Sequence, residues 1–238
     1  MSHDRNGNVA AAGLLVAIGI AVGGYFVGHG LLEARSSDRY VTVRGLAERE
    51  VPANLVVWPI TCAVTADDLA TLQRRNEESV AKIRDFLADD FSDDEISSSE
   101  PRITDRQAQG VVNQGGRLER YVAQTTVTVR STRIDAVQAA MVRTGELVGQ
   151  SVALVRNYDA STEYFFTGLE EVKPEMIAEA TRDARRAAEQ FAEDSGARVG
   201  GIRNAQQGYF SIQDRDRFSP EHKNIRVVTT VQFFLIDD

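Results

Sequence analysis

Cysteine and histidine are scarce in this chain of 238 residues, and their scarcity excludes several kinds of site. The single cysteine, Cys62, cannot form an intrachain disulfide. Structural zinc sites need several Cys and His ligands at short spacing, whereas His3, His29 and His222 are far apart along the chain. Cys62 lies in an alternating apolar run, which favours a buried thiol over a reactive one. We therefore predict no metal site.

The scarcity of cysteine and histidine also leaves few residues that could act as a nucleophile or a general base. A nucleophilic Ser, Thr or Cys needs a neighbouring base, usually His, and only His222 lies in the body of the chain, in a polar loop. The sequence has no Gly-x-Ser-x-Gly elbow, and the Gly-Gly pairs at 115–116 and 200–201 precede no Gly-Lys-Ser/Thr, so they are predicted to be turns. We expect no catalytic residues and no cofactor, hence a non-enzymatic protein. An uncharacterised hydrolase or redox enzyme is the least favoured alternative.

Basic residues are outnumbered, 27 against 35 acidic, and the net charge is −8. The charges of residues 1–39 cancel, so the acidic excess belongs to the remainder of the chain. This balance argues against a nucleic-acid partner, which requires a basic face. The densest acidic run, residues 89–95, lacks the residue order of a calcium loop and is predicted to be a solvated turn. Glu170 and Glu171 are expected at the N-terminal end of a helix.

Charged residues are absent between Arg5 and Glu33. An apolar run of this length exceeds the roughly 20 residues that a helix needs to cross a membrane. It also exceeds the usual apolar region of a signal peptide, about 7–15 residues. We predict a short tail at residues 1–8, an uncleaved transmembrane signal anchor at 9–32 and a linker at 33–39. A removed signal peptide is the alternative.

Small residues recur in this predicted anchor at four-residue spacing. Gly19 with Gly23 and Gly24 with Gly28 are candidate sites of close helix packing in the membrane. The alternative is that glycine is simply common in membrane helices.

Periodicity over residues 40–238 predicts an α+β fold, with a largely antiparallel sheet packed against three helices. The predicted helices are residues 66–88, 134–145 and 174–194. The predicted strands are residues 40–45, 55–64, 96–108, 118–130, a pair within 152–166, 200–212 and 224–236.

Particular residues are expected at the ends and edges of these elements. Pro59 predicts an edge or a bulge in its strand. Thr65 or Asp67 is the expected cap of the first helix. Pro174 is expected at the first position of the third helix and Gly196 just past its end. The predicted inner stripe of that helix is Met176 or Ile177, Ala180, Ala184, Ala187 and Phe191.

Five segments resemble the SIMPL-domain family in the family's order. They are YVTVRG at residues 40–45, EVPANL at 50–55, EISSS at 95–99, YVAQTTVTVR at 121–130 and the Ala-rich helix at 178–192. The resemblance implies an α+β fold, export to the periplasm or cell surface, and assembly into large rings or channel-like oligomers in some members. It also implies a loose link to oxidative-stress tolerance in bacteria and an adaptor role in a vertebrate relative. No catalytic residues are established for the family.

Together these patterns predict a homo-oligomeric envelope protein anchored in the cytoplasmic (inner) membrane. Its SIMPL-like domain, residues 40–238, is expected in the periplasm or outside the cell. Arginines after the apolar run favour the opposite orientation under the positive-inside rule, and the family resemblance outweighs that signal. The alternative function is an adaptor that binds another envelope protein.

Overall fold

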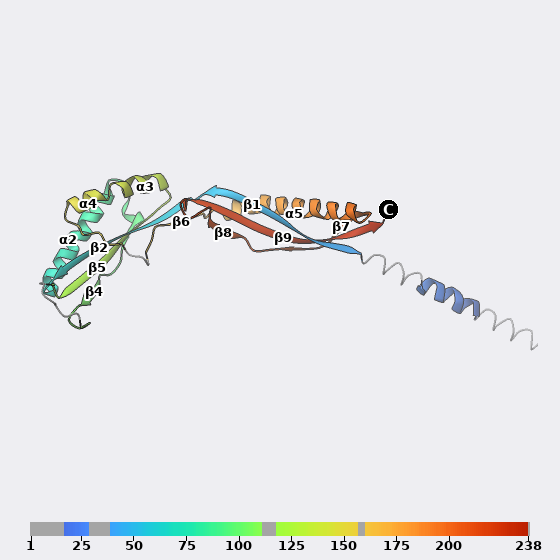
Figure 1. Cartoon of the computed structure of the whole chain (residues 1–238), viewed down its shortest axis with the longest axis horizontal. Coiled ribbons are helices and arrows are strands. Elements are labelled where there is room, and N and C mark those ends of the chain that lie inside the picture. Colours follow the sequence, from blue (N-terminus) through green and yellow to red (C-terminus); the bar gives the residue numbers. More distant parts are fainter. Residues whose placement is uncertain (1–16, 29–38, 111–117, 157–159, 238) are drawn as a thin grey trace, which may run out of the picture. The chain divides into compact units, whose positions relative to one another are not determined.

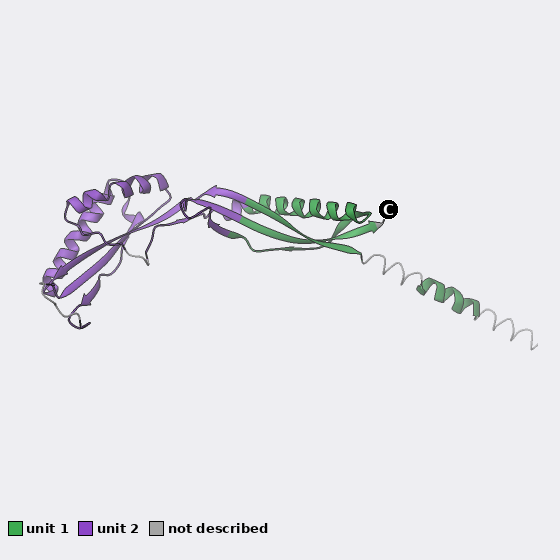
Figure 2. Ribbon diagram, in the orientation of Figure 1, with its two compact units in different colours: residues 1–48, 173–211, 226–238 green, residues 49–172, 212–225 purple. Residues whose placement is uncertain are grey.

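The computed structural model describes residues 17–28, 39–110, 118–156 and 160–237 (Figure 1). The fold is α+β, with two sheets and four helices among the described residues after residue 39. The chain divides into two compact units (Figure 2). Unit 1 comprises residues 1–48, 173–211 and 226–238, and unit 2 comprises residues 49–172 and 212–225. The predicted single sheet is thus two sheets, because each group of strands buries its own apolar face.

The first sheet has the strand order β1-β9-β7, and β8 pairs with β9. Its members are β1 (Tyr40–Pro52), β7 (Ala197–Gln207), β8 (Ser211–Asp214) and β9 (His222–Asp237). Two strands were predicted over 200–212 and 224–236, but the first of them divides into β7 and β8. The first strand was predicted to close at Gly45, whereas β1 continues through Gly45 to Pro52.

Helix α5 (Leu169–Asp194) covers the first sheet with its small residues. Ala184 and Ala188 pack in one cluster with Val231 and Phe233 of β9. At Gly45 the approach is so close that an added Cβ would lie 1.8 Å from the Ala180 carbonyl oxygen. Glycine and alanine therefore let this helix lie against the sheet backbone.

Two expectations for α5 were wrong in detail. The helix begins at Leu169, so Pro174 lies inside it, one turn from the N-terminal end, where the loss of an N–H removes only one helical hydrogen bond. The buried stripe keeps a strict four-residue step, and Phe191, expected inside, is 51% exposed. Gly196 follows the helix as predicted, with a φ of +67°. The buried residues are Met176, Ala180, Ala184, Ala188 and Ala192.

The second sheet has the order β3-β5-β2-β6, with β4 also paired to β5. Its strands are β2 (Leu55–Ala66), β3 (Ile96–Ser98), β4 (Arg102–Asp105), β5 (Tyr121–Ser131) and β6 (Glu163–Phe165). The helices α2 (Leu69–Ala88), α3 (Ile134–Val142) and α4 (Gly145–Gly149) pack on it, and a 3-10 turn, η1, spans Asp93–Glu95. Alternation decides which side chains are buried: Trp58, Ile60 and Cys62 of β2 all belong to the core.

Local breaks divide several predicted elements of unit 2. The helix predicted at 134–145 becomes α3 and α4, and Val142 at the break is 86% exposed. The strand predicted at 96–108 becomes β3 and β4, because Pro101 between them lacks a ladder donor. The pair predicted within 152–166 reduces to β6 and an isolated bridge between Cys62 and Leu154.

The predicted cap of the first helix was one residue off. The Asp68 carboxylate accepts the Thr71 N–H at 2.9 Å, so Asp68 is the N-cap of α2, rather than Thr65 or Asp67. Sequence spacing alone does not distinguish neighbouring acidic residues at a helix start.

The predicted membrane segment is described only in part, as a helix at residues 17–28. Within the described part of the chain, no helix is both long enough and apolar enough to span a bilayer. The tail at 1–8, both ends of the predicted span and most of the linker lie outside the described residues, as does the Gly-Gly pair at 115–116.

Candidate functional site

Neither residue considered for nucleophilic chemistry is bonded to a catalytic partner among the described residues. Cys62 is fully buried, its thiol lies 3.6 Å from the Thr125 carbonyl oxygen, and burial raises the pKa of the thiol. His222 lies with its Nδ1 3.7 Å from the Glu50 carboxylate. Arg215 donates to the same carboxylate at 2.6 Å. The Cys62 contact joins β2 to β5, and the Glu50 contacts join β1 to Arg215 and His222.

Three acidic residues of the run at 89–95 pair with arginines. Asp90 pairs with Arg143, and Asp93 lies 3.6 Å from Arg84. In the residues that the structure describes, no three His, Cys, Asp or Glu side chains gather as metal ligands would. The predicted solvated turn is η1, which the sequence placed correctly between a helix and a strand.

Glu95, at the end of this run, connects η1 with the end of β5 and the start of α3. Its carboxylate accepts the Ser92 N–H at 3.1 Å and an Arg133 N–H at 2.7 Å. Burial acts to raise its pKa, but hydrogen bonds from Ser131, Ser92 and Arg133 outweigh burial and lower the pKa to about 2. The carboxylate therefore remains ionised as a structural anchor.

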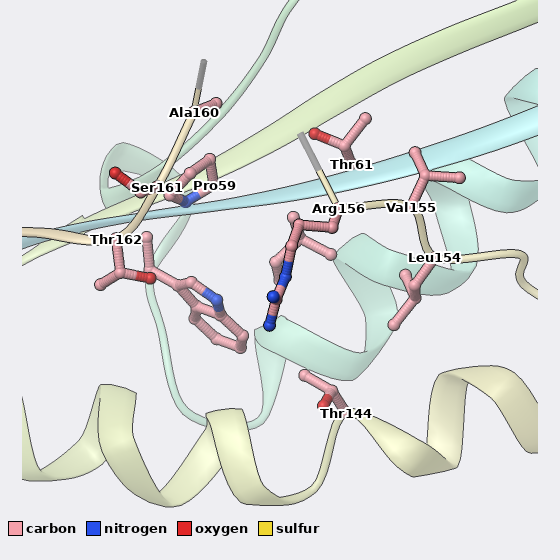
Figure 3. A pocket seen from close by; sticks show the side chains of 11 residues that line it. Pro59, Thr61, Thr144, Leu154, Val155, Arg156, Ala160, Ser161 and Thr162 are labelled. Atoms are coloured by element: carbon pink, nitrogen blue, oxygen red, sulfur yellow. The ribbon is translucent and has the colours of Figure 1, made fainter. Parts of the chain in front are cut away.

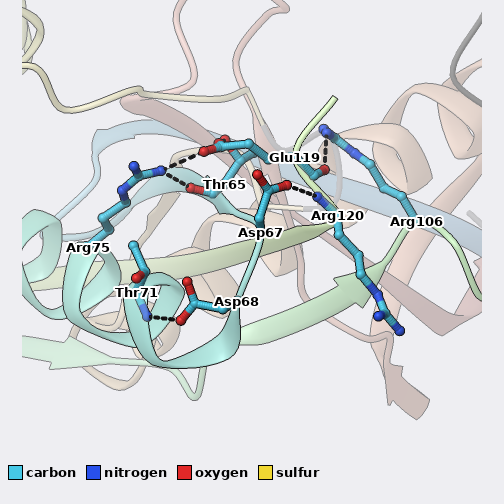
Figure 4. A network of polar contacts seen from close by, with 8 residues as sticks. All are labelled: Thr65, Asp67, Asp68, Thr71, Arg75, Arg106, Glu119 and Arg120. Carbon is cyan, nitrogen blue, oxygen red and sulfur yellow. Dashed lines mark hydrogen bonds and ion pairs between the residues drawn. The ribbon is translucent and has the colours of Figure 1, made fainter. Parts of the chain in front are cut away.

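A polar network joins the start of α2 to the start of β5 (Figure 4). Arg75 donates to the Glu119 carboxylate at 2.9 Å and also to the Thr65 carbonyl oxygen. Asp67 accepts the Arg120 N–H at 3.3 Å. Because these charges already have protein partners, the network is a structural tie between strand and helix.

A cavity of about 690 Å³ opens beside β2 in unit 2 (Figure 3). It lies where the ladder on this side of β2 is interrupted, between the Val57–Glu163 pair and the bridge at Cys62–Leu154. Pro59 was predicted at an edge or bulge. β2 is an inner strand between β5 and β6, but Pro59 lies in this gap, where β2 has no described pairing on the β6 side. The other lining residues include Trp58, Thr144, Arg156, Ala160, Ser161 and Thr162.

The outer edge of β7 in unit 1 carries no strand among the described residues, because β7 ends the strand order. Two register shifts interrupt its first half, and Gly200–Gly201, predicted as a turn, lies at the first of them inside the strand. Asn204 to Gln207 then pair with β9 in regular register. Tyr209, just beyond, is 100% exposed.

The opposite edge of the first sheet, β1, is blocked near its middle. The Leu46 N–H donates to the Asp183 carboxylate of α5 at 2.9 Å. This hydrogen bond and one from Arg186 lower the pKa of Asp183, so the carboxylate stays charged. An inward-held charge of this kind prevents another strand from pairing at Leu46.

The candidate packing glycines all lie in the described helix at residues 17–28. No atom comes within 4 Å of a Cβ added at Gly19, Gly23, Gly24 or Gly28. Every residue of the segment is exposed. The glycines thus present an open helix surface, and whether another helix packs there stays a prediction.

The sequence analysis missed the β7 edge and Arg156. The polar run after Gly201 is a weak signal for an exposed strand. Arg156 carries no signal at all, because its place in a cavity depends on residues about 100 positions away.

Comparison with known families agrees with this fold. The sequence matches none of the curated proteins. The family model SIMPL, described as a protein of unknown function (DUF541), matches residues 41–233. The match includes all the strands from β1 to β9 apart from Tyr40 at the start of β1 and the last four residues of β9, and it leaves out the helix at residues 17–28. The chain therefore belongs to the SIMPL family.

Proposed function

We propose that the protein is a non-enzymatic envelope module that self-assembles through the β7 edge. It is tethered to the cytoplasmic membrane by its N-terminal helix, and the SIMPL domain lies in the periplasm or outside the cell. In this proposal the assembly is a scaffold or a channel-like oligomer, and a role in oxidative-stress tolerance would follow from that assembly.

The open edge of β7 is the observation that carries this proposal. Gly208 donates its N–H to the Val228 carbonyl oxygen of β9 at 2.9 Å. Donors alternate sides along a strand, so Gln206 and Asn204 also face β9, whereas Gln207 and Ala205 face outward. An outward row of backbone groups is a template for another strand, and a second copy of this chain can supply one.

The tether is supported by the exposed apolar surface at residues 17–28. Ile18, Ile20, Phe26 and Val27 are each at least half exposed. A cluster of this kind on a helix is unfavourable in water and favourable in lipid.

The experiment measures solution mass by light scattering, for the full chain in detergent and for residues 36–238 without it. Ala205→Pro removes an outward-facing N–H and leaves the β9 pairing intact, so it is expected to convert a discrete oligomer into monomer. Ala205→Thr, which keeps the N–H, is the control and is expected to retain the oligomer. Unchanged circular dichroism of both variants establishes that they are folded.

A monomer in both wild-type preparations would end the self-assembly proposal. An oligomer that survives Ala205→Pro would place the interface elsewhere on the molecule. The adaptor alternative is favoured by two exposed aromatic side chains, Tyr209 and Phe218. A monomer that co-purifies with one envelope protein, and loses it on Tyr209→Ser and Phe218→Ser substitution, would support that alternative.

A further inference from the structure

The cavity beside β2 contains one charged side chain and no described partner for it. Among the described residues that line the cavity, Arg156 is the only charged one. Figure 3 shows its side chain reaching from the loop side toward Thr144 on the helical side. No hydrogen bond or ion pair to Arg156 is formed among the described residues. The described lining thus contributes a positive charge, in a protein of net charge −8.

An aromatic wall lies beside this charge. Trp58 lines the cavity and is only 6% exposed, so it is held in place by the core of unit 2. Ser161 and Thr162, on the same lining, add hydroxyl groups with no hydrogen-bond partner among the described residues. An apolar wall with a few polar groups is typical of small-molecule sites, as is a volume of about 690 Å³.

The backbone of the cavity disfavours an extended peptide. The Thr61 carbonyl oxygen accepts the Val155 N–H, so alternate residues of β2, including Pro59, face this side. Pro59 has no N–H to donate, and a peptide strand added here would lose a ladder hydrogen bond at the centre of the gap. The site therefore suits a compact molecule better than a strand.

We propose that this cavity binds a small aromatic carboxylate. The Arg156 guanidinium pairs with the carboxylate, because its planar fork matches the two carboxylate oxygens. The aromatic ring lies against Trp58, and a single negative charge matches the single arginine. The site lies wholly within unit 2 and does not depend on self-assembly.

The test is a titration of the full chain in detergent with phenylacetate and with its neutral isostere phenylacetamide. Trp58 is the only tryptophan, so its fluorescence reports on this cavity, and calorimetry gives the affinity independently. We expect phenylacetate to bind with a Kd of about 1 mM or lower, and phenylacetamide to bind at least about tenfold more weakly.

Three variants test the roles of the residues. Arg156→Gln is expected to weaken phenylacetate binding about tenfold or more, to the level of phenylacetamide. Arg130→Gln removes an exposed arginine of β5 outside the cavity and is expected to leave binding unchanged. Ala160→Phe fills the cavity and is expected to abolish binding of both compounds.

Equal affinity of the wild type for the acid and the amide would overturn the proposal, as would unchanged binding by Arg156→Gln. Absence of any fluorescence change or heat with phenylacetate up to about 10 mM would also overturn it.

Discussion

Glu95 illustrates how a single side chain can hold separate elements together. Its carboxylate caps η1 through Ser92 and reaches Arg133 at the start of α3. The sequence analysis treated the acidic run as a solvated turn, which describes Asp93 well but not Glu95, whose side chain is only 18% exposed. The difference lies in Ser131 and Arg133, which approach Glu95 through the fold rather than along the chain.

Replacing this carboxylate with an amide is expected to destabilise the protein in a pH-dependent way. Glu95→Gln is expected to lower the free energy of unfolding at pH 7 by about 1–2 kcal/mol, allowing for solvent screening. Because the folded pKa is about 2 and the reference value is 4.5, the stabilisation is complete above about pH 4.5 and is lost as the pH falls toward 2. Urea denaturation between pH 2 and 7 measures both effects.

Glu100→Gln provides the matched control for that measurement. Glu100 is exposed and its side chain has no ion pair among the described residues, so the free energy of unfolding is expected to stay within about 0.5 kcal/mol of wild type. If the two variants show the same pH dependence, Glu95 is not the anchor described above.

At the scale of elements, α5 lies so close to β1 that the contact leaves no space for a side chain at position 45. The alanine stripe of α5 was predicted from its period, but Gly45 was assigned only to the end of a strand. The two observations are one feature: the helix backbone at Ala180 occupies the space that a side chain at position 45 would need. A large residue on either element would separate the layers.

Gly45→Ala is therefore expected to lower the free energy of unfolding by about 2–3 kcal/mol, because the added methyl meets backbone that cannot move independently. Gly201→Ala is the control, since nothing lies within 4 Å of its added Cβ, and a change within about 0.5 kcal/mol is expected. Thermal and urea denaturation of both variants make the comparison. Similar stabilities would mean that α5 lies farther from β1.

At the scale of the whole molecule, the N-terminal helix and the SIMPL domain differ in the kind of surface that they expose. The exposed apolar residues at 17–28 favour lipid, whereas the acidic excess lies in the rest of the chain. We expect the full chain to remain in the membrane pellet after alkaline extraction, and residues 36–238 to stay in the supernatant. Release of the full chain by alkali would contradict a spanning anchor.

Side-chain periodicity along the sequence was enough to determine the α+β class and most strands and helices. Trp58, Ile60 and Cys62 fall on one buried face because a strand alternates, whatever lies across from it. Gly196 likewise acts through its own backbone chemistry, so its place just past a helix was predicted correctly. These are local properties, and a sequence displays them directly.

Only the tertiary structure decided which surfaces remain open. Pairings between residues far apart in the chain decide three features. They divide the strands into two sheets, place the Asp183 carboxylate at Leu46, and leave the outer edge of β7 free among the described residues. The cavity arises in the same way, since Arg156 and Trp58 line one cavity only because β2 pairs with β5 and β6. Long-range contacts are many-body outcomes of packing, and no local pattern in the sequence specifies them.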